Sequence, residues 1–206
     1  MKTSYKIIAV LMAGLFTAGM AQAQVGRLNV NINYSINTPT GDFKDFVNKT
    51  SYRSWAASLL YGINDKLSVG FGTGFQDFYQ KYPRQVYKLE GGGDISAVLS
   101  NSVQAIPLLA QVQYNFTPQA AVQPYVGIGV GGNIILYRQY LGEFGNSKNK
   151  FGFAARPEAG VFIPFRKGGP AGITVRADYN YMPVNYNDLK GMDNWGAGIG
   201  VKFPLQ

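Results

Sequence analysis

The stretch Leu28-Asn29-Val30-Asn31-Ile32-Asn33-Tyr34-Ser35-Ile36-Asn37 decides the fold. Its apolar side chains all fall on even positions, and its asparagines and its serine all fall on odd positions. Successive side chains of a β-strand point to opposite faces, whereas those of a helix repeat about every 3.6 residues. The stretch is therefore predicted to be a strand with one apolar and one polar face.

The same alternation recurs seven more times toward the C-terminus. In each recurrence, mostly bulky apolar residues alternate with small, polar or charged ones. The segments are residues 54–63, 67–76, 106–115, 126–136, 155–163, 173–181 and 195–203. Together with the first stretch they predict eight strands, an even number.

The connections between these strands alternate between short and long. The short ones fall at 64–66, 117–123 and 166–170, and the long ones at roughly 38–51, 80–102, 140–149 and 184–193. Bacterial outer-membrane barrels have an even number of antiparallel strands, short periplasmic turns and longer outer loops. We therefore expect an all-β fold, an eight-stranded antiparallel up-and-down transmembrane β-barrel with both termini in the periplasm.

The chemistry of the two strand faces indicates which one meets lipid. The interior of an eight-stranded barrel is only wide enough for side chains, which suits glycine, serine, asparagine and paired charges. The bulky apolar face suits lipid, where a closed barrel pairs every backbone polar group. A soluble lipocalin-like carrier would turn the apolar face inward, so the pattern disfavours it.

The N-terminus has the features of an export signal. Lys2 and Lys6 are basic, and the apolar stretch Ile7–Met20 follows them. The small residues of Ala21-Gln22-Ala23 then predict cleavage before residue 24. Because a membrane-spanning helix needs about 20 apolar residues, this stretch is short for an anchor. We expect a cleaved signal peptide over 1–23 and one barrel domain over 24–206.

The chain contains no cysteine and no histidine, and charged residues make up only 15% of it. These absences exclude disulfides, thiolate metal sites, Ser-His-Asp or Cys-His catalysis, and zinc or haem held by histidine. Outer-membrane acyltransferases, deacylases, phospholipases and proteases generally rely on a catalytic histidine. We therefore expect no enzyme, and we predict no catalytic residue, no cofactor and no metal site.

Four charged residues of the predicted sixth and seventh strands form the main candidate site. If these strands pair through a turn near Lys167-Gly168, Arg156 faces Asp178 and Glu158 faces Arg176. Opposite charges across a ladder attract, and inside a barrel paired charges are tolerated where unpaired ones are costly. The cluster is predicted to be either a structural network that fills the lumen or a gate that blocks ion flow.

Aromatic residues gather near the predicted strand ends, as expected for girdles at the two membrane interfaces. The predicted interface aromatics are Trp55, Phe75, Tyr137, Tyr181 and Trp195 at the outer end and Tyr61, Tyr114, Phe116 and Phe203 at the inner end. The ordinary β-propensity of aromatic residues is the alternative explanation.

The predicted loops carry basic residues mixed with acidic ones, in a chain of net charge +8. The basic residues are Lys44, Lys49, Lys81, Arg84, Lys88, Lys148, Lys150 and Lys190. Cations at this level would attract the phosphates of lipopolysaccharide, and solvated loops are the alternative. The expected partners are outer-membrane lipid and lipopolysaccharide. We expect no nucleic-acid partner and a monomeric protein.

Four segments carry a resemblance to a known family. They are Asn37–Phe43, the hairpin Tyr61–Gly70, the glycine ladder Tyr125–Gly131 and the closing strand Gly198–Phe203. Over roughly residues 24–206 they resemble the small outer-membrane β-barrel family, the OmpA/OmpX/OmpW-like group also described as outer membrane protein beta-barrel domain or porin-family proteins.

The resemblance implies an integral protein of the Gram-negative cell envelope. Its closing strand looks like the signal read by the barrel-assembly machinery, although Pro204-Leu205-Gln206 follow the final aromatic residue. Two functions stay open. One is a structural or surface-interaction role without catalysis, and the other is a small pore or lateral conduit for small or apolar solutes. The narrow interior of an eight-stranded barrel argues against a general porin.

Overall fold

The computed structural model describes residues 26–88, 94–142, 144–186 and 189–205. The predicted signal peptide, with its cleavage motif at Ala21 and Ala23, lies outside these residues. The described chain forms a closed barrel with the strand order β1-β12-β9-β8-β7-β6-β3-β2, every neighbouring pair antiparallel. The predicted eight-stranded all-β barrel is confirmed. No helix in the described part of the chain is long and apolar enough to cross a membrane.

The barrel strands and the smaller elements in the loops have the following bounds. The barrel strands are β1 (Leu28–Pro39), β2 (Ser51–Gly62), β3 (Leu67–Lys81), β6 (Leu99–Asn115), β7 (Gln123–Leu141), β8 (Phe144–Pro164), β9 (Gly172–Asn180) and β12 (Asn194–Leu205). The loop elements are the helical turn α2 (Phe43–Phe46) and the short strands β4 (Gln85–Lys88), β5 (Asp94–Ala97), β10 (Asn185–Tyr186) and β11 (Leu189–Lys190).

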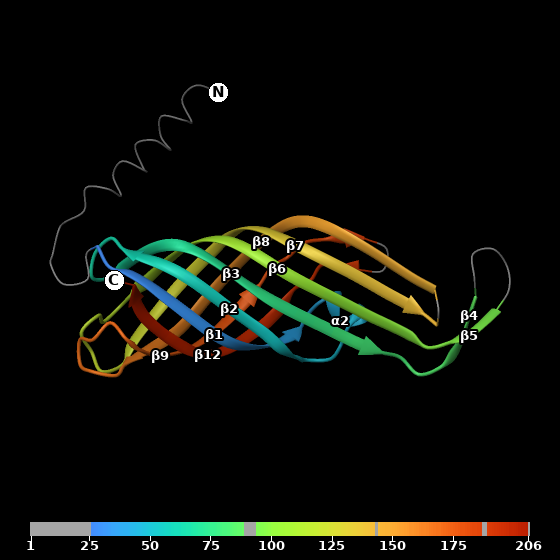
Figure 1. Cartoon of the computed structure of the whole chain (residues 1–206), viewed down its shortest axis with the longest axis horizontal. Coiled ribbons are helices and arrows are strands. Elements are labelled where there is room, and N and C mark those ends of the chain that lie inside the picture. The colour runs from blue at the N-terminus through green and yellow to red at the C-terminus, as the bar shows by residue number, and fades with distance from the viewer. Residues whose placement is uncertain (1–25, 89–93, 143, 187–188, 206) are drawn as a thin grey trace, which may run out of the picture.

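The barrel has two different ends. Figure 1 shows the C-terminus and the start of β1 at the same end, which we call the termini end. The links at this end are short, at residues 63–66, 116–122 and 165–171. The opposite end, which we call the loop end, carries α2 and the two small hairpins β4–β5 and β10–β11 (Figure 1).

One side of the barrel is taller than the other at the loop end. The neighbouring strands β3, β6, β7 and β8 contain 15, 17, 19 and 21 residues, whereas β1, β2, β9 and β12 contain 12, 12, 9 and 12. We call the long strands the tall wall, because their ends project beyond the other strands at the loop end (Figure 1).

The tall wall corrects one predicted loop. β7 and β8 pair up to Leu141 and Phe144, so most of the segment 140–149 is strand and only its tip turns. The prediction of a long loop there was wrong because residues 145–149 are exposed on both faces. A strand with water on both faces needs no alternation of apolar and polar residues.

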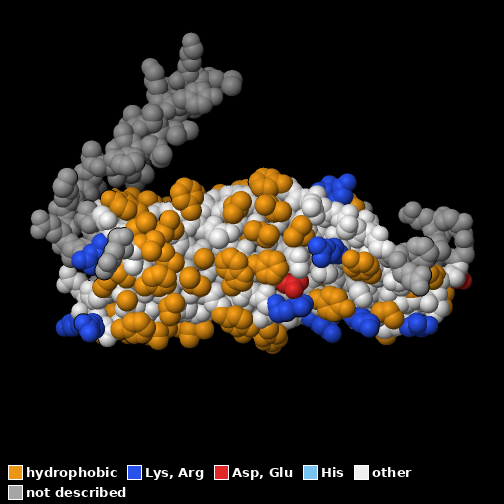
Figure 2. All heavy atoms as spheres, viewed as in Figure 1, with side chains coloured by type: hydrophobic (Ala, Val, Ile, Leu, Met, Phe, Trp, Pro, Cys, Tyr) orange, Lys and Arg blue, Asp and Glu red, His pale blue; other side chains and the backbone are white. Residues whose placement is uncertain are grey.

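Side-chain burial follows the predicted alternation. In β1, Asn31, Asn33 and Ser35 are buried in the lumen, whereas Ile32 and Tyr34 on the outer face are 46% and 50% exposed. Figure 2 shows hydrophobic side chains gathered most densely over the half of the visible face nearer the termini end, and Lys and Arg side chains at the rim of that end and scattered over the half toward the loop end. The apolar residues therefore form the outer face and the polar residues the lumen.

Two prolines coincide with breaks in the ladders. β3 and β6 keep one register on both sides of a gap, in which Gly74 lies level with Pro107. β8 and β9 have a similar gap at Pro157, between the pairs Glu158–Asp178 and Ala155–Tyr181. Proline has no N–H to donate, which accounts for a missing rung.

Candidate functional site

The four predicted charged residues meet in the middle of the lumen. Arg176 donates a hydrogen bond from Nη1 to Glu158 Oε2 at 3.0 Å, and its Nη2 lies 3.4 Å from Asp178 Oδ1. Arg156 Nε lies 3.8 Å from the same oxygen of Glu158. Arg156, Arg176 and Asp178 are at most 7% exposed. Two cations and two anions thus form one buried, charge-balanced cluster, which we call the lumen network.

The register of the lumen network differs from the predicted one. Glu158 lies directly opposite Asp178, and Gly160 lies opposite Arg176, so the strands are offset by two residues from the expected pairing. The predicted facing pair of Arg156 and Asp178 is not formed. Arg176 instead reaches diagonally to Glu158 and also contacts the neighbouring Asp178 on its own strand face.

Amides extend the lumen network across the barrel. Asn180 Nδ2 donates to Asp178 Oδ2 at 2.7 Å and to Asn194 Oδ1 at 3.1 Å. Asn194 Nδ2 donates across the lumen to Gln76 Oε1 at 3.1 Å, which joins β12 to β3. A small cavity of about 10 Å³ lies beside Arg156, Arg176 and Asp178. Such a space holds roughly one water molecule at most.

Glycine makes room for the network on β12. Gly196 lies opposite Asp178, and a Cβ built on Gly196 would lie 2.4 Å from Asp178 Oδ2. A Cβ on Gly198 would lie 3.3 Å from Arg176 Nε. Side chains at these positions would crowd the charged groups, so these glycines are a condition for packing the network.

An apolar cluster fills the lumen toward the loop end. Turn α2 and the β9–β12 loop pack against the inner face of the tall wall, with the Phe43 and Phe78 rings 4.9 Å apart and the Phe46 and Tyr137 rings 5.4 Å apart. We call this cluster the plug. It consists of Phe43, Phe46, Val47, Phe78, Val103, Ala105, Leu109, Ile135, Tyr137, Ala154, Met182, Leu189 and Met192.

The plug corrects the prediction for Tyr137. This residue was expected at the outer membrane interface, but it is 1% exposed and packs inside the barrel. Alternation in β7 places even positions such as Ile134 outside and odd positions inside, so the strand period itself contradicts an outward Tyr137. The expectation of an aromatic girdle was wrong at this position.

The other predicted interface aromatics lie on outward strand faces, except Phe116 in the β6–β7 link and Tyr181 directly after β9. Trp55, Tyr61, Tyr181 and Trp195 are 46%, 47%, 46% and 57% exposed. Tyr114 and Phe203 are 39% and 36% exposed, Phe116 next to Tyr114 is 49% exposed, and Phe75 is half-buried. Their contact with a membrane interface stays a prediction.

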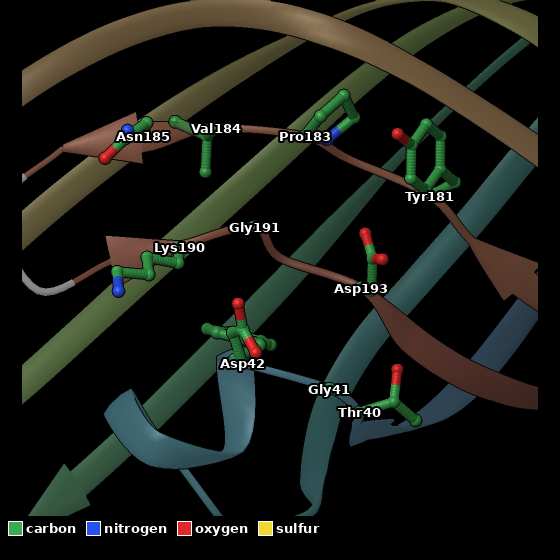
Figure 3. Close-up of a pocket in the computed structure, with 11 residues that line it drawn as sticks. Thr40, Gly41, Asp42, Tyr181, Pro183, Val184, Asn185, Lys190, Gly191 and Asp193 are labelled. Atoms are coloured by element: carbon green, nitrogen blue, oxygen red, sulfur yellow. The ribbon is translucent and has the colours of Figure 1, made fainter.

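A pocket of about 590 Å³, lined by both polar and apolar residues, opens at the loop end between the β1–β2 loop and the β9–β12 loop (Figure 3). Figure 3 places Asp193 between the segments of Thr40 and Tyr181. Asp193 accepts hydrogen bonds from Met182 N at 2.9 Å and from Tyr179 Oη at 3.2 Å, and its carbonyl accepts one from Thr40 N at 2.8 Å. The carboxylate of Asp193 therefore holds the β9–β12 loop, and its backbone carbonyl joins this loop to the β1–β2 loop.

The plug is the part of the site that the sequence analysis missed. Phe43, Phe46 and Val47 have the i, i+3, i+4 spacing of a helical turn with one apolar face, which is a usable signal. Met182 and Met192 lie in a loop that also contains Val184 and Leu189, and the sequence analysis did not single them out. Among the residues that the structure describes, no three acidic side chains lie close enough to hold a metal ion.

Comparison with known proteins agrees with this architecture. The chain matches the family described as "Outer membrane protein beta-barrel domain" over residues 7–203. It is similar to the crystal structure of Neisserial surface protein A, with a TM-score of 0.52 and 16% identity over 87% of this chain and 96% of that one. It is also similar to the outer membrane protein OprG from Pseudomonas aeruginosa, with a TM-score of 0.52 and 15% identity over 89% and 98%. None of the curated proteins compared with the chain matches it. At these identities the structural likeness shows the fold alone.

Proposed function

The chain belongs to the outer membrane protein beta-barrel domain family, and from this premise we propose that it is a sealed, non-enzymatic barrel that acts through its surface. In this proposal it is exported by a cleaved signal peptide over 1–23 and inserted into the outer membrane by the barrel-assembly machinery as a monomer. Its termini end faces the periplasm and its loop end faces outward. The observation that supports this proposal most strongly is that the lumen network and the plug fill the lumen.

Two barriers in series support a sealed lumen. The cavity beside Arg156, Arg176 and Asp178 in the lumen network is about 10 Å³, too little for a hydrated ion. Above it the plug offers apolar side chains, and moving an ion past them would cost its hydration without replacing it. Within the described residues, the two barriers together support a lumen without a continuous water-filled path.

The surface at the loop end supports an interaction role. The tall wall projects there, and the two covering loops are held by buried contacts such as that of Phe43 with Phe78. A surface built on buried contacts keeps one shape, which reduces the entropy lost when a partner binds. Structural reinforcement of the membrane and presentation of this surface are the roles that such a barrel supports.

Liposome swelling tests the sealed barrel. Liposomes that contain the inserted protein should swell no faster in isotonic arabinose than protein-free liposomes, because the lumen has no aqueous path. Heat-modifiable migration on a detergent gel, checked on the same sample, confirms that the barrel is folded. Rapid swelling with correctly folded protein would contradict the proposal.

A lateral conduit for apolar solutes is a second candidate, and one observation favours it. The ladder gap at Pro107 and Gly74 borders an apolar groove of about 590 Å³ on the outer wall. If solutes pass through this gap, Pro107→Ala should slow the entry of a fluorescent fatty acid into liposomes, because alanine restores a backbone donor. Equal entry rates for wild type, Pro107→Ala and protein-free liposomes would remove this candidate.

A further inference from the structure

We propose that the outer face of the tall wall binds one anionic, phosphate-bearing lipid, with its headgroup on Arg138 and Lys81 and an acyl chain in the groove below them. The inference rests on the proposed function in one respect, which is that the barrel spans a bilayer. It adds a defined site and a ligand class to that role.

The strand register places the two cations on one patch. Tyr79 on β3 pairs with Ser102 on β6, which pairs with Arg138 on β7. Two residues nearer the loop end along each strand, Lys81 pairs with Ser100, which pairs with Tyr140. With strands about 4.8 Å apart and about 3.4 Å per residue, the Cα atoms of Lys81 and Arg138 lie about 12 Å apart. The two long side chains can therefore reach the same headgroup.

The charge of this patch is available for a ligand. Arg138 and Lys81 are exposed, and within the described residues neither has a carboxylate partner. The acidic residue of this face is Asp77, and Arg53 Nη2 lies 3.3 Å from its Oδ2. That pair cancels its own charge, so the patch carries a net positive charge from Arg138 and Lys81.

The neighbouring side chains add hydrogen-bond donors. Tyr79 and Tyr140 are 45% and 48% exposed on the same face, and Ser100 and Ser102 lie between them in the register. Hydroxyl groups beside a guanidinium suit phosphate oxygens, to which arginine donates two parallel hydrogen bonds. The patch thus offers the donors that a phosphate ester requires.

An apolar groove lies below the patch, over β3, β6 and β7 of the tall wall and the adjoining β2 and β1. Its volume is about 590 Å³. The small residues Ala57, Thr73 and Ala110 line it beside the larger Phe71 and Leu108, which are 72% and 50% exposed. Small side chains among large ones leave a depression in the lipid-facing surface, and the width of an acyl chain is comparable to that of such side chains.

The distance between groove and patch matches a lipid. Leu108 and Ser102 are six residues apart on β6, about 20 Å along the strand. For a strand tilt of about 40° this is about 15 Å in depth, or half of the roughly 30 Å hydrocarbon core. A headgroup on the patch therefore places its chain ends at the groove. A free phosphate ion would use the patch alone, so the groove favours a membrane lipid.

The test compares binding of bis-phosphorylated lipid A with binding of its dephosphorylated form to the folded barrel in a neutral detergent. The variant Lys81→Gln with Arg138→Gln removes the patch, and Arg166→Gln with Lys167→Gln removes two cations at the termini end as a matched control. Wild type and the control pair should bind lipid A equally, and the patch variant on the order of tenfold more weakly, the scale of one charge-assisted contact. Ala110→Trp, which fills the groove, should also weaken binding.

Three results would overturn the lipid site. They are equal affinity of wild type and the patch variant, equal binding of phosphorylated and dephosphorylated lipid by the wild type, and full displacement of lipid A by millimolar inorganic phosphate. Flotation of the protein with phosphatidylcholine liposomes tests the membrane role separately. If flotation fails, the proposed function fails. If flotation holds while the affinities are equal, only the lipid site is wrong.

Discussion

Glu158 and Asp178 lie directly opposite one another on β8 and β9, although both are acidic and both lie in the lumen. Like charges at facing positions repel, and the repulsion is stronger away from water. Arg176 resolves the conflict because its two terminal nitrogens contact the two carboxylates separately, at 3.0 and 3.4 Å. The stability of this part of the barrel therefore depends on Arg176.

Removing Arg176 should destabilise the barrel strongly. Arg176→Met leaves two facing carboxylates without their shared cation, and loss of one partner of a buried pair costs about 3–5 kcal/mol. The free energy of unfolding in urea, followed by tryptophan fluorescence, measures this cost. The matched control is Arg53→Met, because Arg53 is 63% exposed and exposed pairs contribute at most about 1 kcal/mol. Equal losses for the two variants would show that the lumen network is not a stabilising unit.

A single methyl group at Gly196 should disturb the network. The added Cβ of Gly196→Ala would lie 2.4 Å from Asp178 Oδ2, which forces a shift that costs about 1–3 kcal/mol. The matched control is Gly152→Ala, whose added Cβ would lie 3.5 Å from its nearest neighbour, the carbonyl oxygen of Pro183. Its free energy of unfolding should change by about 0.5 kcal/mol or less. Thermal unfolding of the two variants in detergent measures the difference. A tolerated alanine at 196 would mean that the lumen is looser than described.

The plug should contribute to stability as a packed core. Phe78 is fully buried against Phe43, and Phe78→Ala should cost about 3–5 kcal/mol through the lost contacts and the cavity. Phe78→Leu refills most of the space and should cost clearly less, about 1.5 kcal/mol. Urea unfolding of both variants gives the comparison. If both substitutions leave the unfolding free energy unchanged, the covering loops do not pack on the tall wall.

Tryptophan fluorescence should report contact with lipid. Trp55 and Trp195 are the two tryptophans of the chain, and both are exposed on the outer face near the loop end of their strands. Bromine atoms placed near the lipid headgroups should quench them more than bromine atoms at the chain ends, because aromatic residues at strand ends sit at the interface. Strong quenching by aqueous iodide with no quenching by brominated lipid would argue against a membrane-spanning barrel.

Much of the barrel can be predicted from alternation alone. The stretch Leu28–Asn37 is a strand whose odd positions are buried and whose even positions face outward beyond Val30, as its sequence indicates. The rule works where one face meets the lumen and the other an apolar surface. It fails at residues 145–149, which are exposed on both sides, and there the sequence resembles a loop.

The candidate site shows where sequence reasoning ends. The four charged residues are recognisable as a cluster, but their register depends on the turn between β8 and β9, which is centred on Gly168 with φ of +72°. Moving the centre of the turn by one residue shifts the pairing of β8 with β9 by two residues. This shift is the difference between the predicted and the observed pairing. The plug depends on tertiary contacts between distant loops, as in the packing of Phe43 on Phe78, and local patterns carry no information about such contacts.

Single-channel recording in planar lipid bilayers tests the sealed lumen most directly. Wild-type protein with verified heat-modifiable folding should give no discrete openings above the baseline of the bilayer. The variants Glu158→Ala and Arg176→Ala should also stay closed, because the plug still blocks the lumen when the network is weakened. Openings should appear only when both barriers are removed, that is, when Phe43, Phe46 and Val47 are replaced by glycine in the Arg176→Ala variant. Steady, ohmic openings of the folded wild-type protein would contradict the account.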